Sequence, residues 1–169
     1  RLLFIHISEA SQSKAFLLFE TLNYRGVPLS AIDIIKNKML ATLESKHGVR
    51  IEDSYDDWQE ILNNLPEDSD QDRFLRQFYN AFKFDPRIKI DRVTRATRSN
   101  IIAIYEMLIK KDAKSIFDQL TEKAQVYNQL IEPESYQTSP LTESLVNLER
   151  IGAVPSYTFL LYLFSLDEN

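Results

Sequence analysis

The chain has no cysteine among its 169 residues, and only three glycines and two histidines. The lack of cysteine excludes disulfides, thiolate metal sites and cysteine nucleophiles. His6 and His47 lie far apart in the sequence and have no carboxylates at metal-ligand spacing around them, so no zinc site is expected. The sequence also contains no glycine-rich loop of the kind that cradles phosphates.

Long hydrophobic runs and excess positive charge are absent as well. No apolar run approaches the length that crosses a bilayer, so we expect no membrane segment. The formal net charge of −5 argues against a globally basic nucleic-acid-binding protein. The N-terminus lacks both the methionine of a chain start and the features of a signal peptide. We therefore expect part of a longer, cytoplasmic protein.

The composition that remains favours helices. Hydrophobic residues make up 44% of the chain, enough for a sizeable core, and leucine, isoleucine, lysine and glutamate are frequent. We predict a mainly α fold, a helical bundle of about seven or eight helices. One short strand, Leu2–Ile7, has no partner in this bundle and would belong to a missing domain. Residues 1–13 are thus predicted to be the end strand and linker of an upstream domain, and residues 14–169 a helical domain.

Apolar spacing and capping signals place the helices. After a first helix near residues 15–22, the expected ranges are 31–44, 55–65, 69–84, 100–109, 113–131, 140–152 and 156–166. Ser30 and Asp33 form a capping box in which Asp33 reaches back to the Ser30 amide, while Ser54 and Asp112 are expected caps and Gly48 a stop.

Two of these helices carry apolar side chains that have more than one interpretation. Phe74, Leu75, Phe78, Tyr79 and Phe82 form an aromatic stripe, which is core more often than a base-stacking platform. The last helix is apolar nearly all round, so it is either central to the core or covered by a partner.

Charge changes sign along the chain. Nine acidic residues and no basic one lie between Arg50 and Arg73, and a solvated helix face explains them better than a metal site or a mimic of DNA charge. From Arg87 to Lys111 the balance is reversed, and Arg92, Arg95 and Arg98 would line one side of a helix if this stretch is helical. The candidates for contact with DNA phosphates are Arg87, Lys89, Arg92, Arg95 and Arg98. Pairing with the acidic run, or plain solvation, is the simpler interpretation.

The most specific pattern is F-E-x-L-N-x-R-G-x-P-L-S-x-x-D-x-I-K-N, which spans residues 19–37. It resembles the signature of GmrSD-type, modification-dependent restriction endonucleases, prokaryotic defence proteins with a ParB/sulfiredoxin-like N-terminal nucleotidase region. Besides the candidate nucleotide site, the motif residues expected to have a structural role are Phe19, Glu20, Gly26, Ser30, Asp33 and Asn37. The family's Asp-Gly-Gln-Gln-Arg string and its His-Asn-His nuclease site do not occur in this sequence.

The resemblance implies a function for the parent protein and a site in this chain. The parent would hydrolyse a nucleoside triphosphate with a divalent metal and cut modified DNA, and this helical middle region would couple the two steps. Asn23 would orient the nucleotide, Arg25 would bind phosphate and Lys36 would add charge. The catalytic residues would lie upstream, so this chain alone is expected to be inactive and to hold no cofactor.

Two alternatives remain from the residues themselves. Arg25 and Asp33 would otherwise form an ion pair that fixes a helix hairpin. The whole chain would otherwise be a stand-alone helical interaction or regulatory module without catalysis, in which the last apolar helix binds a partner subunit or a second copy of the chain.

Overall fold

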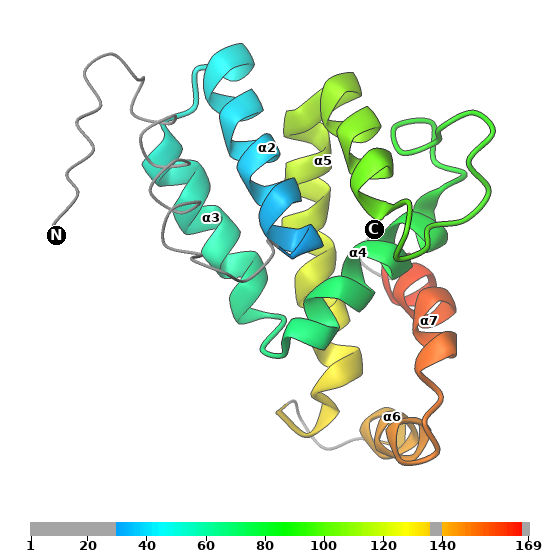
Figure 1. The fold of residues 1–169 in the computed structure, drawn as a ribbon. Coiled ribbons are helices and arrows are strands. Elements are labelled where there is room, and N and C mark those ends of the chain that lie inside the picture. The colour runs from blue at the N-terminus through cyan, green and yellow to red at the C-terminus, as the bar shows by residue number, and fades with distance from the viewer. Residues whose placement is uncertain (1–29, 136–139, 167–169) are drawn as a thin grey trace, which may run out of the picture.

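The computed structural model describes residues 30–135 and 140–166, and its regular secondary structure there is helical throughout (Figure 1). The elements are α2 (Ala31–His47), α3 (Ile51–Asn63), α4 (Asp68–Phe82), α5 (Ile101–Ile131), α6 (Pro140–Arg150) and α7 (Tyr157–Phe164), with short 3-10 helices η1 (Pro133–Ser135) and η2 (Val154–Ser156). This confirms the mainly α prediction. These six α-helices are slightly fewer than predicted, and the expected strand Leu2–Ile7, the helix near residues 15–22 and the boundary at residue 13 lie outside the described residues.

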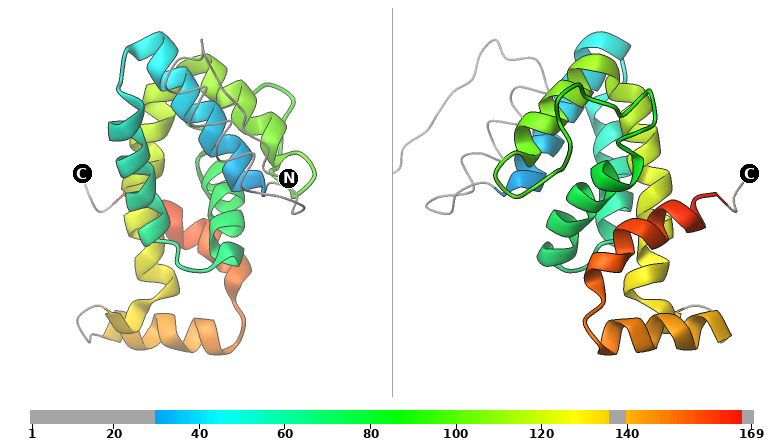
Figure 2. Two further views of the ribbon diagram at one scale, coloured as in Figure 1. Left: turned by 60° about the vertical axis from the view of Figure 1, so that its left-hand side comes forward. Right: turned by 90° about the vertical axis from the view of Figure 1, so that its right-hand side faces the viewer.

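The long helix α5 is the centre of the fold. It packs against α2, α3, α4 and α7 (Figure 1). Helices α2 and α3 lie side by side along it, whereas α4 and α7 pack on each other. Helix α6 lies across the far end of α5 and reaches η1 (Figure 2).

Helix α2 begins and ends where the sequence predicts. The Asp33 amide donates to Ser30 Oγ at 3.3 Å, which caps the first turn. The helix ends at His47 because Gly48 takes a left-handed backbone with φ of +66°, and its N–H donates to the Glu44 carbonyl at 3.1 Å.

The predicted cap of α3 is wrong. Helix α3 begins at Ile51, so Ser54 lies inside the helix, where it is buried and its hydroxyl donates to the Arg50 carbonyl at 3.2 Å. The earlier start has a physical reason, since it places Ile51 in the core while Arg50 pairs with Asp53 one turn later.

Aromatic side chains join the helices in the core. Trp58 of α3 stacks on Phe117 of α5 with 6.1 Å between ring centres, and Tyr127 of α5 lies 5.3 Å from Phe74 and 6.3 Å from Tyr157. Each fully buried ring of this kind contributes roughly 1.5–3 kcal/mol to stability. The aromatic stripe of α4 is therefore mainly core, and its buried members, Phe74, Leu75, Phe78 and Tyr79, are not a base-stacking platform.

Helix α5 is broken at the residue predicted to cap its second half. Asp112 has φ of −161° and ψ of 89°, outside the helical range, and its Oδ1 accepts a hydrogen bond from the Ser115 amide at 3.0 Å. The carboxylate thus caps the first turn of the helical segment that follows the break. The two predicted helices, 100–109 and 113–131, are therefore two helical segments that meet in a sharp kink at Asp112 within α5.

We expect Asp112→Ala to lower the free energy of unfolding by about 1 kcal/mol, the usual cost of losing a helix cap. Urea denaturation followed by circular dichroism measures this change. Asp118→Ala is the matched control, because Asp118 is exposed and interacts with Lys114 only at 3.5 Å, so its loss should change stability by less than about 0.5 kcal/mol. Equal effects of the two substitutions would show that the cap has no special role.

Candidate functional sites

The motif residues divide between the described and the undescribed parts of the chain. Those outside the described residues are Phe19, Glu20, Asn23, Arg25 and Gly26. Ser30, Asp33, Lys36 and Asn37 lie at the N-terminal end of α2. The structure therefore leaves the proposed role of Arg25, and its alternative pairing with Asp33, as predictions.

The described motif residues form a hydrogen-bonded and ionic network. The Ser30 hydroxyl donates to Asp33 Oδ2 at 2.5 Å, so the carboxylate reaches the hydroxyl of Ser30 and not its amide, which corrects the predicted geometry of the capping box. Asp33 Oδ1 lies 3.8 Å from Lys36 Nζ, and the Lys36 side chain is 8% exposed, with its ammonium 5.8 Å from the centre of the Tyr55 ring. Lys36 is thus a buried, paired cation near the start of α2.

Asn37 is the motif residue whose side chain is incompletely satisfied. Its Oδ1 is buried and accepts no hydrogen bond from any residue that the structure describes. A buried amide oxygen without a donor costs free energy, so such an atom generally has a partner. The motif end of α2 therefore carries an acceptor that a ligand or another part of the protein would satisfy.

The basic stretch is not helical, so the condition under which Arg92, Arg95 and Arg98 would line one side of a turn is not met. Residues 83–100, here called the basic loop, contain turns and irregular backbone between α4 and α5. Arg87 pairs with Asp85 at 2.7 Å, and the guanidinium holds the pKa of that carboxyl below its usual value. The other candidates for DNA contact, Lys89, Arg92, Arg95 and Arg98, are exposed.

The expected pairing between the acidic and basic runs is not seen within residues 30–135 and 140–166. The carboxylates of the acidic run pair with nearby cations instead: Asp53 with Arg50, Asp70 with Arg73 and Asp72 with Arg76. Lys89, Arg92, Arg95 and Arg98 form no ion pair with any described residue. Local partners are favoured because a helix brings residues three or four apart together without ordering a second segment.

Side chains from α4 and α5 hold the basic loop in place. Asn80 forms two hydrogen bonds with the Ala96 backbone, accepting from its amide at 2.8 Å and donating to its carbonyl at 3.3 Å. Tyr79 donates to the Val93 carbonyl at 3.0 Å, and Lys83 to the Thr94 carbonyl at 2.7 Å. From α5, Lys111 donates to the backbone at the start of the loop. Sequence analysis missed these residues, although asparagine in the aromatic stripe of α4 is an unusual choice for a helix interior.

Backbone strain marks the middle of the loop. Residues 90–93 form a turn in which the Val93 amide donates to the Ile90 carbonyl at 3.3 Å. Arg92 lies within this turn with φ of +66°, in the left-handed region that favours glycine. An arginine therefore stands where its side chain raises the energy of the backbone.

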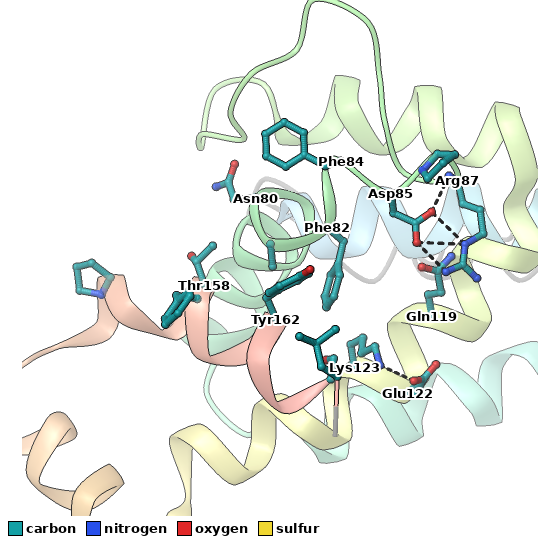
Figure 3. A pocket seen from close by; sticks show the side chains of 16 residues that line it. Asn80, Phe82, Phe84, Asp85, Arg87, Gln119, Glu122, Lys123, Thr158 and Tyr162 are labelled. Carbon is teal, nitrogen blue, oxygen red and sulfur yellow. Dashed lines mark hydrogen bonds and ion pairs between the residues drawn. The ribbon is translucent and has the colours of Figure 1, made fainter. Parts of the chain in front are cut away.

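An apolar groove forms a further candidate site. It lies between the end of α4, the second half of α5 and α7 (Figure 3). Phe84 is 82% exposed and Phe159 62%, while Tyr162 and Leu166 also present apolar surface. The paired charges Asp85–Arg87 and Glu122–Lys123 flank the groove, as Figure 3 shows. Helix α7 is thus half core and half exposed, because Leu161 and Tyr157 on its other side are buried.

The described residues offer no cluster of three or more histidine, aspartate or glutamate side chains that could hold a metal ion. Within the same residues, no helix combines the length and the apolar character needed to span a membrane. Comparison of the chain with models of protein families, with curated proteins and with solved structures gave no match.

We expect Asn80→Ala to loosen the basic loop and to destabilise the protein by about 1–3 kcal/mol, because the Ala96 backbone loses both of its side-chain partners. Amide hydrogen exchange should become faster at Ala96 and its neighbours, and urea denaturation gives the loss of stability. Asn147→Ala, at an exposed asparagine of α6, is the control and should change neither. Unchanged exchange at Ala96 would contradict this account of the loop.

Proposed function

We propose that this chain is the helical region of a GmrSD-type restriction protein, which completes the nucleotide pocket of an upstream nucleotidase and couples it to a DNA-cleaving domain. The proposal rests on the motif at residues 19–37. The observation that supports it in the structure is the polar network at the start of α2, where a buried Lys36 lies beside Asp33 and Asn37 keeps an unpartnered buried acceptor among the described residues. Buried polar groups of this kind gather at functional sites more often than elsewhere.

The candidate nucleotide-binding residues of the motif each have a role in this proposal. Arg25 binds phosphate through its planar guanidinium, and Asn23 orients the nucleotide. Lys36 adds positive charge and, through Asp33, stabilises the start of α2. The nucleoside triphosphate's divalent metal would be held by residues other than those described, which contain no suitable cluster. Modified DNA is the substrate of the parent protein in this proposal.

Nucleotide hydrolysis by the full-length parent tests the proposal, with the four ribonucleoside triphosphates as substrates. We expect Arg25→Ala to reduce kcat/KM by about tenfold or more, which corresponds to about 1.4 kcal/mol of transition-state stabilisation. Arg50→Ala is a matched control, since Arg50 is exposed and pairs with Asp53 on α3. Circular dichroism checks that both variants fold.

Equal rates for the wild type and Arg25→Ala would make the motif a structural element rather than part of a nucleotide site. If neither the wild type nor the variants hydrolyse any of the four nucleotides, the proposal that the parent protein is a nucleotidase is contradicted. An upstream sequence in the parent without an Asp-Gly-Gln-Gln-Arg string would contradict the family assignment on which the proposal depends.

The second candidate function is that of a helical interaction module, and the exposed apolar side of α7 favours it. Phe159, Tyr162 and Leu166 present their side chains beside Phe84, and exposed apolar patches of this kind mark interaction sites. The lining carries the two ion pairs Asp85–Arg87 and Glu122–Lys123, so these four charges sum to zero and a second copy of the chain would meet no net charge from them. Self-association through this groove can be tested with the chain alone, without a partner protein.

We expect the mass of the chain, measured by light scattering, to rise with concentration if the groove joins two copies. Phe159→Ser should then keep the protein monomeric, because it removes an apolar side chain from the centre of the contact. Ile151→Ser is the control, since Ile151 is equally apolar and 76% exposed but lies outside the groove. A monomeric wild type at every concentration would contradict self-association.

A further inference from the structure

We infer that the basic loop binds the phosphate backbone of double-stranded DNA through Lys89, Arg92, Arg95 and Arg98. Figure 1 shows the loop as a green segment that projects beside the first part of α5, on the opposite side from α3. The inference rests on the proposed function and deepens it by naming a DNA-contacting surface. Its test measures DNA affinity alone, so it can fail or succeed independently of nucleotide hydrolysis.

Ion pairing distinguishes these four cations from the arginines in the neighbouring helices. The chain carries more carboxylates than cations, and the arginines at positions 50, 73, 76 and 87 all have a carboxylate within 4 Å. Lys89, Arg92, Arg95 and Arg98 have none among the described residues, although Asp91 is part of the same loop. Their charge therefore stays available to an outside anion. Three of the four are arginine, whose guanidinium fork matches a phosphate better than a lysine ammonium does.

Hydrogen bonds and buried side chains hold the backbone that carries these charges in one conformation. Tyr79 and Asn80 bind the loop from α4, Lys111 binds it from α5, and Lys83 joins the start of the loop to the Thr94 carbonyl. The buried side chains of Ile88 and Ala96 anchor it further. A surface that is ordered before binding loses less conformational entropy when it meets its ligand. The loop is therefore built to present its side chains and not merely to connect two helices.

The backbone of Arg92 is strained. Glycine at this position would remove the unfavourable contact of the side chain with its own backbone, whose φ is +66°. The sequence nevertheless has an arginine, and a strained residue kept at the surface is a reason to look for a function of its side chain. Phosphate binding supplies that function.

The chemistry of the exposed face favours nucleic acid over an acidic protein. Between residues 88 and 100 the apolar side chains turn inward, since Ile88 and Ala96 are buried and Ile90 and Val93 pack against the core. The outward side chains are the four cations, the single carboxylate of Asp91, and Thr94 and Ser99, whose hydroxyls can donate hydrogen bonds to phosphate oxygens. Protein interfaces carry an apolar centre, whereas DNA interfaces are polar and positive.

Fluorescence anisotropy of the full chain with a labelled, unmodified DNA duplex, over a range of salt concentrations, tests the inference. The variant Arg92→Glu with Arg95→Glu should bind at least about tenfold more weakly. The slope of log K against log salt should become shallower by about 0.9 for each phosphate that the variant no longer neutralises. Arg92→Gly should also weaken binding while keeping or raising thermal stability, because glycine relieves the strained backbone. A weaker interaction of this variant cannot result from unfolding.

The matched control is Lys46→Glu with Arg150→Glu, which makes the same change in net charge at exposed positions outside the loop. Its affinity should stay within about twofold of the wild type at physiological salt, where distant charges are screened. Equal losses of affinity in the two double variants would show that net charge and not the loop governs binding. The inference would be overturned if the wild-type protein did not bind the duplex at low salt. It would also be overturned if the protein bound anionic lipid vesicles but not DNA.

Discussion

The break in α5 at Asp112 is the constraint on which the rest of the structure depends. A straight helix of 31 residues would extend about 46 Å, longer than the neighbouring helices can cover. With the break, the first half packs against α2 and α4, where Tyr105 donates to the Leu75 carbonyl, and the second half packs its rings against α3, α4 and α7. One carboxylate, which accepts a hydrogen bond from the Ser115 amide, caps the helical segment that follows the break.

The candidate sites are extensions of this core. Tyr79 illustrates the connection, because its ring is buried among the helices while its hydroxyl holds the backbone of the basic loop. Phe82 similarly has one neighbour in the core, Phe78, and another, Tyr162, on the wall of the apolar groove. Both surfaces are therefore positioned by side chains whose main energetic role is packing. A change in the packing of Tyr79 or Phe82 in the core would consequently also alter the basic loop or the apolar groove.

Local signals in the sequence predict those parts of the fold that are decided by neighbouring residues. Ser30, Gly48 and Asp112 act within one turn of helix, so their roles are visible from the sequence alone. The start of α3 differs from its prediction because burial of Ile51 outweighs the capping preference of Ser54. The conformation of the basic loop is also beyond sequence analysis. Its backbone is held by contacts that reach back to α4 and forward to α5, and such contacts leave no periodic pattern in the sequence.

The left-handed backbone of Arg92 has a consequence for how this loop evolves. Every arginine codon is a single base change away from a glycine codon, and glycine is the residue that this backbone conformation favours. The substitution that removes the charge is thus both easily reached by mutation and favourable to the fold. In sequences that share this turn, mutation and the stability of the fold would both favour glycine at this position. The frequency with which arginine is found there instead would therefore measure how strongly selection retains its side chain.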